Sequence, residues 1–267
     1  MKRINRWIAK HAWFVYLLLS ITICFGIFSF VYDFLGFVIG CLWVFACSLI
    51  IVRFVFSRRN VLMKEPLAVL LNQCDPYPWL EEVQRQRNYP GNYNLKFQRC
   101  VYEAMALRET GEYEQAYDLL RPLQKTALSK AHPTSQTMYC AEIYYLASKL
   151  GKMSELEDWH TKVVDAYEKL ELISHRKQLA LSMAAHMVRY YMVRQEYDAF
   201  IQELEAIPVR TLREQVVYAM NMACYYVAVD ELENAKKELD FVIANGNKLY
   251  IVTEAKVLLE KINAEER

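Results

Sequence analysis

The sequence lacks the short motifs on which most enzyme activities depend. It contains no phosphate-binding loop, no glycine fingerprint for dinucleotides, no nucleophile elbow and no kinase signature. Its seven cysteines are scattered singly, without a CxxC pair or a spacing typical of metal ligands. We therefore expect reduced, buried thiols, no cofactor and no metal site. The sequence predicts that the protein is not an enzyme.

One spacing resembles part of a catalytic metal site. Glu157 and His160 have the Glu-x-x-His spacing that puts a carboxylate and an imidazole on one helix face, as in di-iron bundles. A di-iron site needs a second copy, and Glu171 with His175 straddles an expected helix end. A solvated helix face is the favoured interpretation, and a membrane-anchored, metal-dependent helical enzyme is the alternative. His186, inside an apolar segment, is expected to be a core histidine whose hydrogen bonds are satisfied.

Charge is almost absent from two stretches near the start of the chain. Residues 12–31 and 34–52 form apolar runs that are separated by Tyr32 and Asp33. A helix of about 20 apolar residues spans the roughly 30 Å hydrocarbon core of a bilayer. The sequence therefore predicts a transmembrane hairpin that contacts the lipid bilayer through residues 12–52. No small-residue cleavage site follows the first run, so we expect an uncleaved anchor rather than a signal peptide.

Charge also differs in sign between the two parts of the chain. Up to Lys64 there are eight Lys and Arg residues and one acid, so the remainder of the 32 bases and 31 acids is 24 bases and 30 acids. Positive charge beside membrane helices tends to stay in the cytoplasm, which predicts a plasma-membrane protein with both termini cytoplasmic. The mildly acidic remainder argues against nucleic acid as a partner, because phosphate binding needs a basic surface.

No Gly/Ser-rich linker divides the chain, so its parts are expected to be joined stiffly. Residues 1–64 are predicted to be the transmembrane anchor with basic flanks, and residues 65–92 a helical adaptor with short helices over 66–73 and 78–87. Trp79 and Leu80 of the adaptor are expected to cap the core that follows. Turn residues over 88–92 then precede a helical repeat domain at residues 93–267.

From residue 93 on, almost nothing in the pattern indicates strands. Apolar residues recur at three- and four-residue spacing, which is typical of amphipathic helices. Similar breaks occur at Gly111, Gly151, Gln195 and Asp230, at successive offsets of 40, 44 and 35 residues. Each break is expected to join two helices, with a residue tolerant of the left-handed region ending the first. A large residue two positions later is expected to pack into each pair: Tyr113, Met153, Tyr197 and Leu232.

This arrangement resembles the tetratricopeptide repeat (TPR), a stacked helix-turn-helix unit of about 34 residues. The similarity extends over residues 93–245 and is best in the last unit, around Leu232 and Ala235. Tyr144 and Phe200 stand where the family has small residues, and helical repeats of longer period remain an alternative. The resemblance implies an all-α fold: a TPR-like α-solenoid of about four helix pairs, closed by a capping helix over residues 248–263.

The resemblance also implies a groove that binds peptides or other proteins, lined by the first helix of each pair. The family's groove positions fall on Met105, Arg108, Tyr145, Ser148, Arg189, Met192, Cys224 and Val227. Arginine beside methionine and tyrosine suits a segment with an apolar anchor and a carboxylate. The alternative for each residue is ordinary packing between helices or a solvated side chain. The sequence thus predicts a membrane-anchored cytoplasmic scaffold, with a purely structural, self-associating membrane protein as the remaining alternative.

Overall fold

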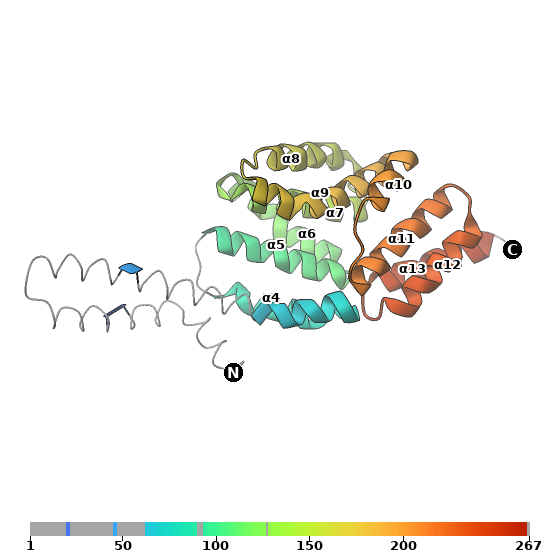
Figure 1. Cartoon of the computed structure of the whole chain (residues 1–267), viewed down its shortest axis with the longest axis horizontal. Helices are drawn as coiled ribbons and strands as arrows, with labels where there is room; N and C mark the ends of the chain where they lie inside the picture. The colour runs from blue at the N-terminus through green and yellow to red at the C-terminus, as the bar shows by residue number, and fades with distance from the viewer. Residues whose placement is uncertain (1–19, 22–44, 47–61, 90–92, 127, 266–267) are drawn as a thin grey trace, which may run out of the picture.

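The computed structural model describes residues 20–21, 45–46, 62–89, 93–126 and 128–265 (Figure 1). Over these residues the fold is all-α and contains no strand, as the sequence predicts. Nearly all of the expected transmembrane hairpin, residues 12–52, lies outside the described residues. Of the helices that are described, none combines the length and the hydrophobicity needed to cross a bilayer.

The described helices follow the order that the sequence predicts. A helix that includes residues 62–73 and α4 (Tyr77–Arg87) form the adaptor, and α13 (Ile251–Glu265) is the closing helix. Between them lie four helix pairs: α5 (Tyr93–Glu109) with α6 (Tyr113–Thr126), α7 (Pro133–Lys149) with α8 (Leu156–Glu168), α9 (Ile173–Arg194) with α10 (Tyr197–Glu205), and α11 (Leu212–Ala228) with α12 (Leu232–Asn245). Short 3-10 turns, η1 (Leu128–Lys130) and η2 (Met153–Glu155), lie in two connections. The helices pack in a repeat-like arrangement.

All four predicted breaks have left-handed backbone. The φ angle is +88° at Gly111, +68° at Gly151, +60° at Gln195 and +62° at Asp230. A residue in this region ends one helix and turns the chain, so that the next helix can pack against it. The expectation that these positions separate the helices of each pair is confirmed.

One packing prediction is wrong. Met153 is 62% exposed, whereas Tyr113, Tyr197 and Leu232 are partly buried. The physical reason is the 3-10 turn η2, which places Met153 ahead of the first turn of α8. Leu156, three residues later, is buried in the core instead.

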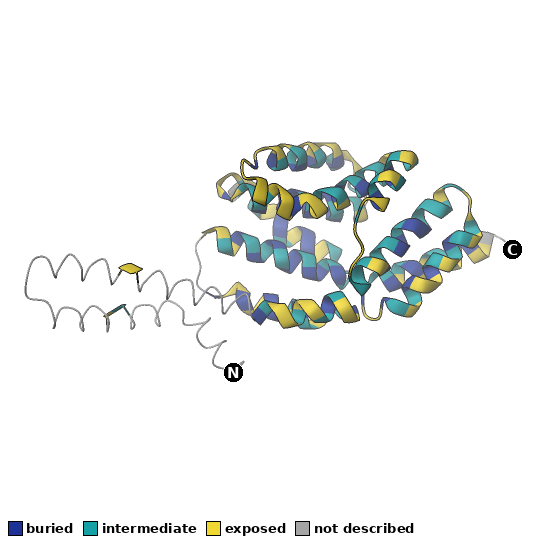
Figure 2. Cartoon of the chain, in the orientation of Figure 1, coloured by how far each residue is buried: buried dark blue, intermediate teal, exposed yellow. Residues whose placement is uncertain are grey.

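Buried residues are concentrated where neighbouring helices meet (Figure 2). One large core lies among α5–α8 and includes Tyr139, Ile143 and Trp159. A second joins the 62–73 helix, α4 and α5 to α11–α13, and it contains Trp79 with Leu80 packed against it, as predicted for the adaptor. A smaller core around Phe200 joins α9 and α10 to α11. Phe200, which stands where the repeat family has a small residue, is therefore fully buried.

The second core closes the stack of helices on itself. Units of an open solenoid contact only their neighbours in sequence, but here α13 and the turn before it contact the adaptor and α5 (Figure 1). The backbone N–H of Lys248 donates to the carbonyl of Cys74 at 3.2 Å, and that of Tyr250 donates to the carbonyl of Glu109 at 3.0 Å. Lys248 Nζ also pairs with Asp75 Oδ2 at 2.7 Å. The helix pairs consequently surround a common interior.

Candidate functional site

Two cavities lie in this interior. The first, which we call the Met138 cavity, measures about 320 Å³ and is lined by α5, α7, α9, α10, α11 and the connection before α11. The second, the Tyr145 cavity, measures about 270 Å³ and is lined by α5, α6, α7, α9, α11, α13 and the turn before α13. Ligand pockets measure roughly 300–1,000 Å³, so the first cavity lies at the lower end of this range and the second just below it. The first helix of every pair therefore contributes to both cavities.

Seven of the eight predicted groove residues line at least one of these cavities. Met105 lines the Met138 cavity, Arg108 and Arg189 line both, and the Tyr145 cavity also receives Tyr145, Ser148, Met192 and Cys224. Val227 lines neither, because it packs against the core shared by the adaptor and α11–α13. The structure thus brings most of the predicted residues together, while their role in binding stays a prediction.

Five residues line both cavities and form the wall between them: Arg108, Arg189, Arg213, Val217 and Asn221. Arg213 was not predicted, since it lies in the first turn of α11, outside the groove positions of the repeat. The carboxylates beside the wall, Glu109 and Glu142, were also missed. Both are buried in the interior, and no spacing along the sequence indicates that they meet arginines from other helices.

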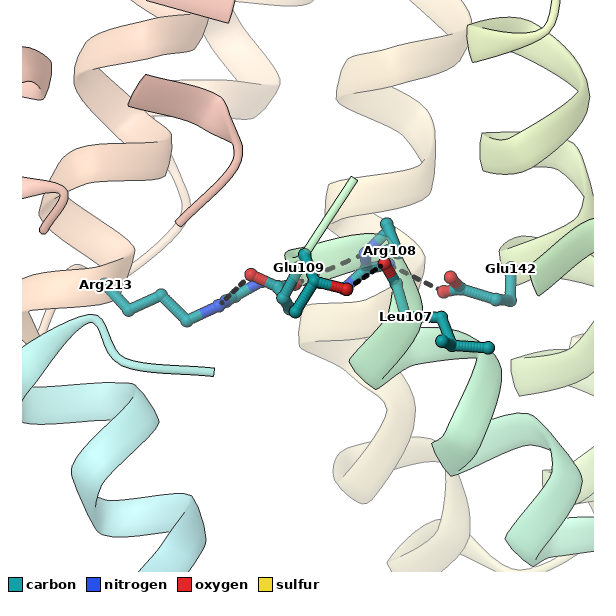
Figure 3. Close-up of polar contacts among 6 residues, drawn as sticks. Leu107, Arg108, Glu109, Glu142 and Arg213 are labelled. Atoms are coloured by element: carbon teal, nitrogen blue, oxygen red, sulfur yellow. Dashed lines mark hydrogen bonds and ion pairs between the residues drawn. The ribbon is translucent and has the colours of Figure 1, made fainter. Parts of the chain in front are cut away.

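A chain of ion pairs runs through this wall from α11 to α7 (Figure 3). Arg213 Nη2 lies 2.5 Å from Glu109 Oε1, and Arg108 Nη2 lies 2.8 Å from the same oxygen. Arg108 Nη1 lies 2.6 Å from Glu142 Oε2. Removing one member of a buried ion pair costs about 3–5 kcal/mol, because the other charge is left without a partner. The wall therefore acts as one electrostatic unit.

The pKa values of this unit reflect burial opposed by charge. Burial by itself raises the pKa of Glu109, but Arg213 and Arg108 lower it overall to about 2. Burial tends to lower the pKa of Arg108, but Glu142 and Glu109 raise it overall. For Glu142, burial outweighs the nearby arginines, and its pKa is raised. Glu142 is thus the least well compensated carboxylate of the wall.

Arg189 differs from the other two arginines because it has no carboxylate partner. Among the described residues its guanidinium makes no ion pair or hydrogen bond, and its contact is with the Tyr145 ring, whose centroid is 3.9 Å from Cζ. Burial lowers the pKa of Arg189. A cation–π contact compensates a buried guanidinium only partly. Arg189 therefore presents to both cavities a guanidinium without an ion pair, although the charge of Glu142 acts on it at longer range.

Two more buried polar atoms on the Met138 cavity have no partner. Glu142 Oε1 and His186 Nδ1 are both buried and make no hydrogen bond. The other ring nitrogen of His186, Nε2, lies 3.0 Å from His160 Nδ1. Burial, with smaller effects of Arg189 and His160, lowers the pKa of His186 to about 3. His186 is thus a neutral core histidine, as expected, but only one of its nitrogens is satisfied.

In the part of the chain that the structure describes, Glu157 and His160 do not lie beside further side chains that could complete a metal site. Glu157 is exposed and lies 3.7 Å from Arg194, while His160 stacks on Tyr190 with ring centroids 3.7 Å apart. Within the described ranges, no group of three or more His, Cys, Asp or Glu side chains is arranged to hold a metal ion.

Comparison with known proteins adds no relative to this description. No protein-family model matches the chain, and neither the curated proteins nor the solved structures include a significant match.

Proposed function

We propose that this chain is a TPR-like interaction protein whose interior surface binds a segment of another protein at the Tyr145 cavity. We further propose that residues 12–52 anchor it in the plasma membrane, with the repeat domain in the cytoplasm. The observation that carries the first proposal is the convergence of four successive hairpins. The first helix of each, α5, α7, α9 and α11, supplies side chains to one cavity.

The residue types in the Tyr145 cavity support this proposal. Tyr113, Tyr145, Met192 and Met220 provide aromatic and thioether surface, and Arg189 provides a cation. Tyrosine, methionine and arginine are enriched at the centres of protein interfaces. Lys149 and Glu254, which also line the cavity, form an ion pair of 2.7 Å.

The test is a crosslinking pull-down of the full-length protein from its native membranes, read by mass spectrometry. The cavity variant is Met192→Glu, which puts a carboxylate into the Tyr145 cavity, and the matched control is Met153→Glu at a side chain that is 62% exposed. Arg108 is unsuitable for this purpose, since its loss leaves Glu142 buried without an ion-pair partner and removes one of the two partners of Glu109.

We expect a partner that the wild type and Met153→Glu capture and that Met192→Glu loses. Ser148→Arg, which fills the same cavity from α7, is the second variant and is expected to lose it too. Folding of each variant is checked by thermal unfolding. Equal capture by all four proteins contradicts binding at this cavity.

The membrane proposal rests on hydropathy and on the basic flanks of residues 12–52. A tethered domain gains effective concentration toward partners at the membrane without any new contact. Protease treatment of intact cells and of inverted vesicles tests the orientation. We expect the repeat domain to be cut only in inverted vesicles, and cutting in intact cells would overturn the cytoplasmic placement.

A further inference from the structure

From the Met138 cavity we infer a second binding site, for a small organic monoanion that has an aliphatic body and a hydroxyl or amide group beside its carboxylate. Arg189 meets the carboxylate, Glu142 and His186 meet the adjacent polar group, and the aliphatic body fills the rest. The site lies across the wall from the Tyr145 cavity. The two sites share the five wall residues, Arg189 among them, but the inference does not rest on the proposed protein binding.

The one arginine of the wall without an ion pair favours an anion. Three arginines, Arg108, Arg189 and Arg213, lie beside three carboxylates, Glu109, Glu142 and Glu214, so the formal charges sum to 3 − 3 = 0. Glu109 and Glu142 pair with the other two arginines, and Glu214 accepts from backbone N–H groups at the start of α11, which leaves Arg189 without an ion pair among the described residues. Buried charges in proteins are normally paired. A single carboxylate on a ligand pairs with Arg189 and adds one negative charge, whereas a doubly charged phosphate would add two.

Two buried polar atoms without hydrogen-bond partners in the described part of the chain favour a ligand that carries a second polar group. Roughly 90% or more of buried polar groups have a hydrogen-bond partner, yet Glu142 Oε1 and His186 Nδ1 have none in residues that are 4% and 1% exposed. Both residues line the Met138 cavity, and Arg189 lines it too. A hydroxyl or amide N–H next to a carboxylate supplies the donor that Glu142 Oε1 lacks, while the carboxylate accepts from the guanidinium.

The remaining surface of the cavity is apolar. Met105, Met138, Val188 and Val217 line it, together with Leu181 and Val209, which are 48% and 38% exposed. Covering exposed aliphatic surface is favourable, because it removes apolar area from water. Leu181 and Val209 therefore give an aliphatic ligand an apolar approach to the interior. The volume of about 320 Å³ lies at the lower end of the range of small-molecule pockets.

The test measures binding of 2-hydroxyhexanoate to the full-length protein in nanodiscs by ligand-observed NMR and calorimetry. Three probes separate the contributions: 2-hydroxyhexanoate, hexanoate without the hydroxyl, and uncharged 2-hydroxyhexanamide. The variants are Arg189→Gln and Arg189→Lys, and the matched control is Arg194→Gln, an exposed arginine one turn further along α9.

We expect 2-hydroxyhexanoate to bind the wild type and Arg194→Gln alike, and the amide to bind at least tenfold more weakly. Arg189→Gln should lose at least tenfold in affinity for the acid, and Arg189→Lys should retain part of it. If Arg189→Gln does not fold, Leu181→Glu replaces it, since it repels an anion from an exposed position.

Several outcomes overturn the inference. Equal binding of the acid and the amide removes the role of the charge, and equal binding by wild type and Arg189→Gln removes the role of Arg189. Absence of binding to the wild type, or binding of a glutamate-containing pentapeptide in place of the small acid, removes the small-molecule site. Capture of a partner at the Tyr145 cavity is measured separately by the pull-down, so failure of one proposal is distinguishable from failure of the other.

Discussion

At the residue scale, two glycines with similar backbone differ in what surrounds them. Gly111 has φ of +88° and Gly151 has φ of +68°, a region that L-residues with a side chain rarely adopt. A Cβ at Gly111 would overlap the ring of Tyr250, whereas a Cβ at Gly151 has no neighbour within 4 Å. Gly111 is thus required both by the turn and by the closure of the helices, and Gly151 by the turn alone.

Alanine at these glycines should separate the two effects. Gly151→Ala is expected to lower the free energy of unfolding by about 1 kcal/mol, the cost of backbone strain alone. Gly111→Ala is expected to lower it by roughly 2–4 kcal/mol, because overpacking against Tyr250 adds to the strain. Denaturant unfolding of the full-length protein in detergent measures both. Equal losses of unfolding free energy would show that the contact with Tyr250 does not add to the cost of a side chain at position 111.

A second residue-scale prediction concerns pH. The folded-state pKa of His186 is about 3, below the ordinary 6.5, so the unfolded chain binds more protons between these values and stability falls as the pH falls. Glu109, with a pKa of about 2 instead of 4.5, acts in the same direction at lower pH. Between about pH 7.5 and 5.0, His186 is expected to remove roughly 2 kcal/mol of the free energy of unfolding.

His186→Phe isolates this effect, since it removes the titrating group and keeps a planar ring. Thermal or denaturant unfolding at the two pH values gives the comparison. The stability of the variant should change less with pH than that of the wild type, with the remainder due to other groups such as His160, whose pKa burial also lowers. An unchanged pH dependence would mean that His186 is not the titrating group.

At the scale of one element, the start of α11 fixes where Arg213 enters the wall. Thr211 and Glu214 form a capping box: Thr211 Oγ1 accepts from the Glu214 N–H at 3.3 Å, and Glu214 Oε2 accepts from the Thr211 N–H at 2.8 Å. These bonds satisfy N–H groups that have no partner inside the helix. The cap therefore determines the first turn of α11, which carries Arg213.

Thr211→Ala is expected to lower the free energy of unfolding by about 1 kcal/mol, the usual cost of losing an N-cap. Thr161→Ala, at an exposed position within α8, is the matched control and should change stability by less than about 0.5 kcal/mol. Denaturant unfolding measures the difference. Comparable effects at both positions would argue that the cap does not hold α11.

At the scale of the whole molecule, the closed arrangement predicts long-range cooperativity. The core that contains Leu239 of α12 also contains Leu70 and Trp79 of the adaptor. In an open solenoid, loosening α12 would affect only its neighbours in sequence. Here the adaptor and α11–α13 should open together, although more than a hundred residues separate them.

Leu239→Ala tests this cooperativity, since Leu239 is fully buried and its loss should cost about 2–5 kcal/mol. Hydrogen exchange of the full-length protein should accelerate in the 62–73 helix and α4 as well as in α11–α13. The matched control, Leu146→Ala in the core of α5–α8, should act mainly on those helices. Unchanged exchange in α4 after Leu239→Ala would contradict closure.

The sequence by itself determined the helices, their pairing and the breaks between them. These features depend on neighbouring residues: apolar spacing sets a helix, and residues such as Gly111 and Asp230 tolerate the left-handed backbone that ends one. The repeat register extended this local information to the interior, so seven of the eight residues at the family's groove positions line the two cavities. It did not foresee Met153, because a 3-10 turn altered one connection.

Only the tertiary structure decided how the pairs close on one another and which charges meet. Glu109, Glu142 and Arg213 belong to three different helices, and nothing in their spacing indicates that they form one ion-pair chain. Closure depends on packing between segments far apart in the sequence, such as Tyr250 against Gly111. For the same reason the unpaired charge of Arg189 appears only in three dimensions: a missing partner is a property of the surroundings and not of the chain.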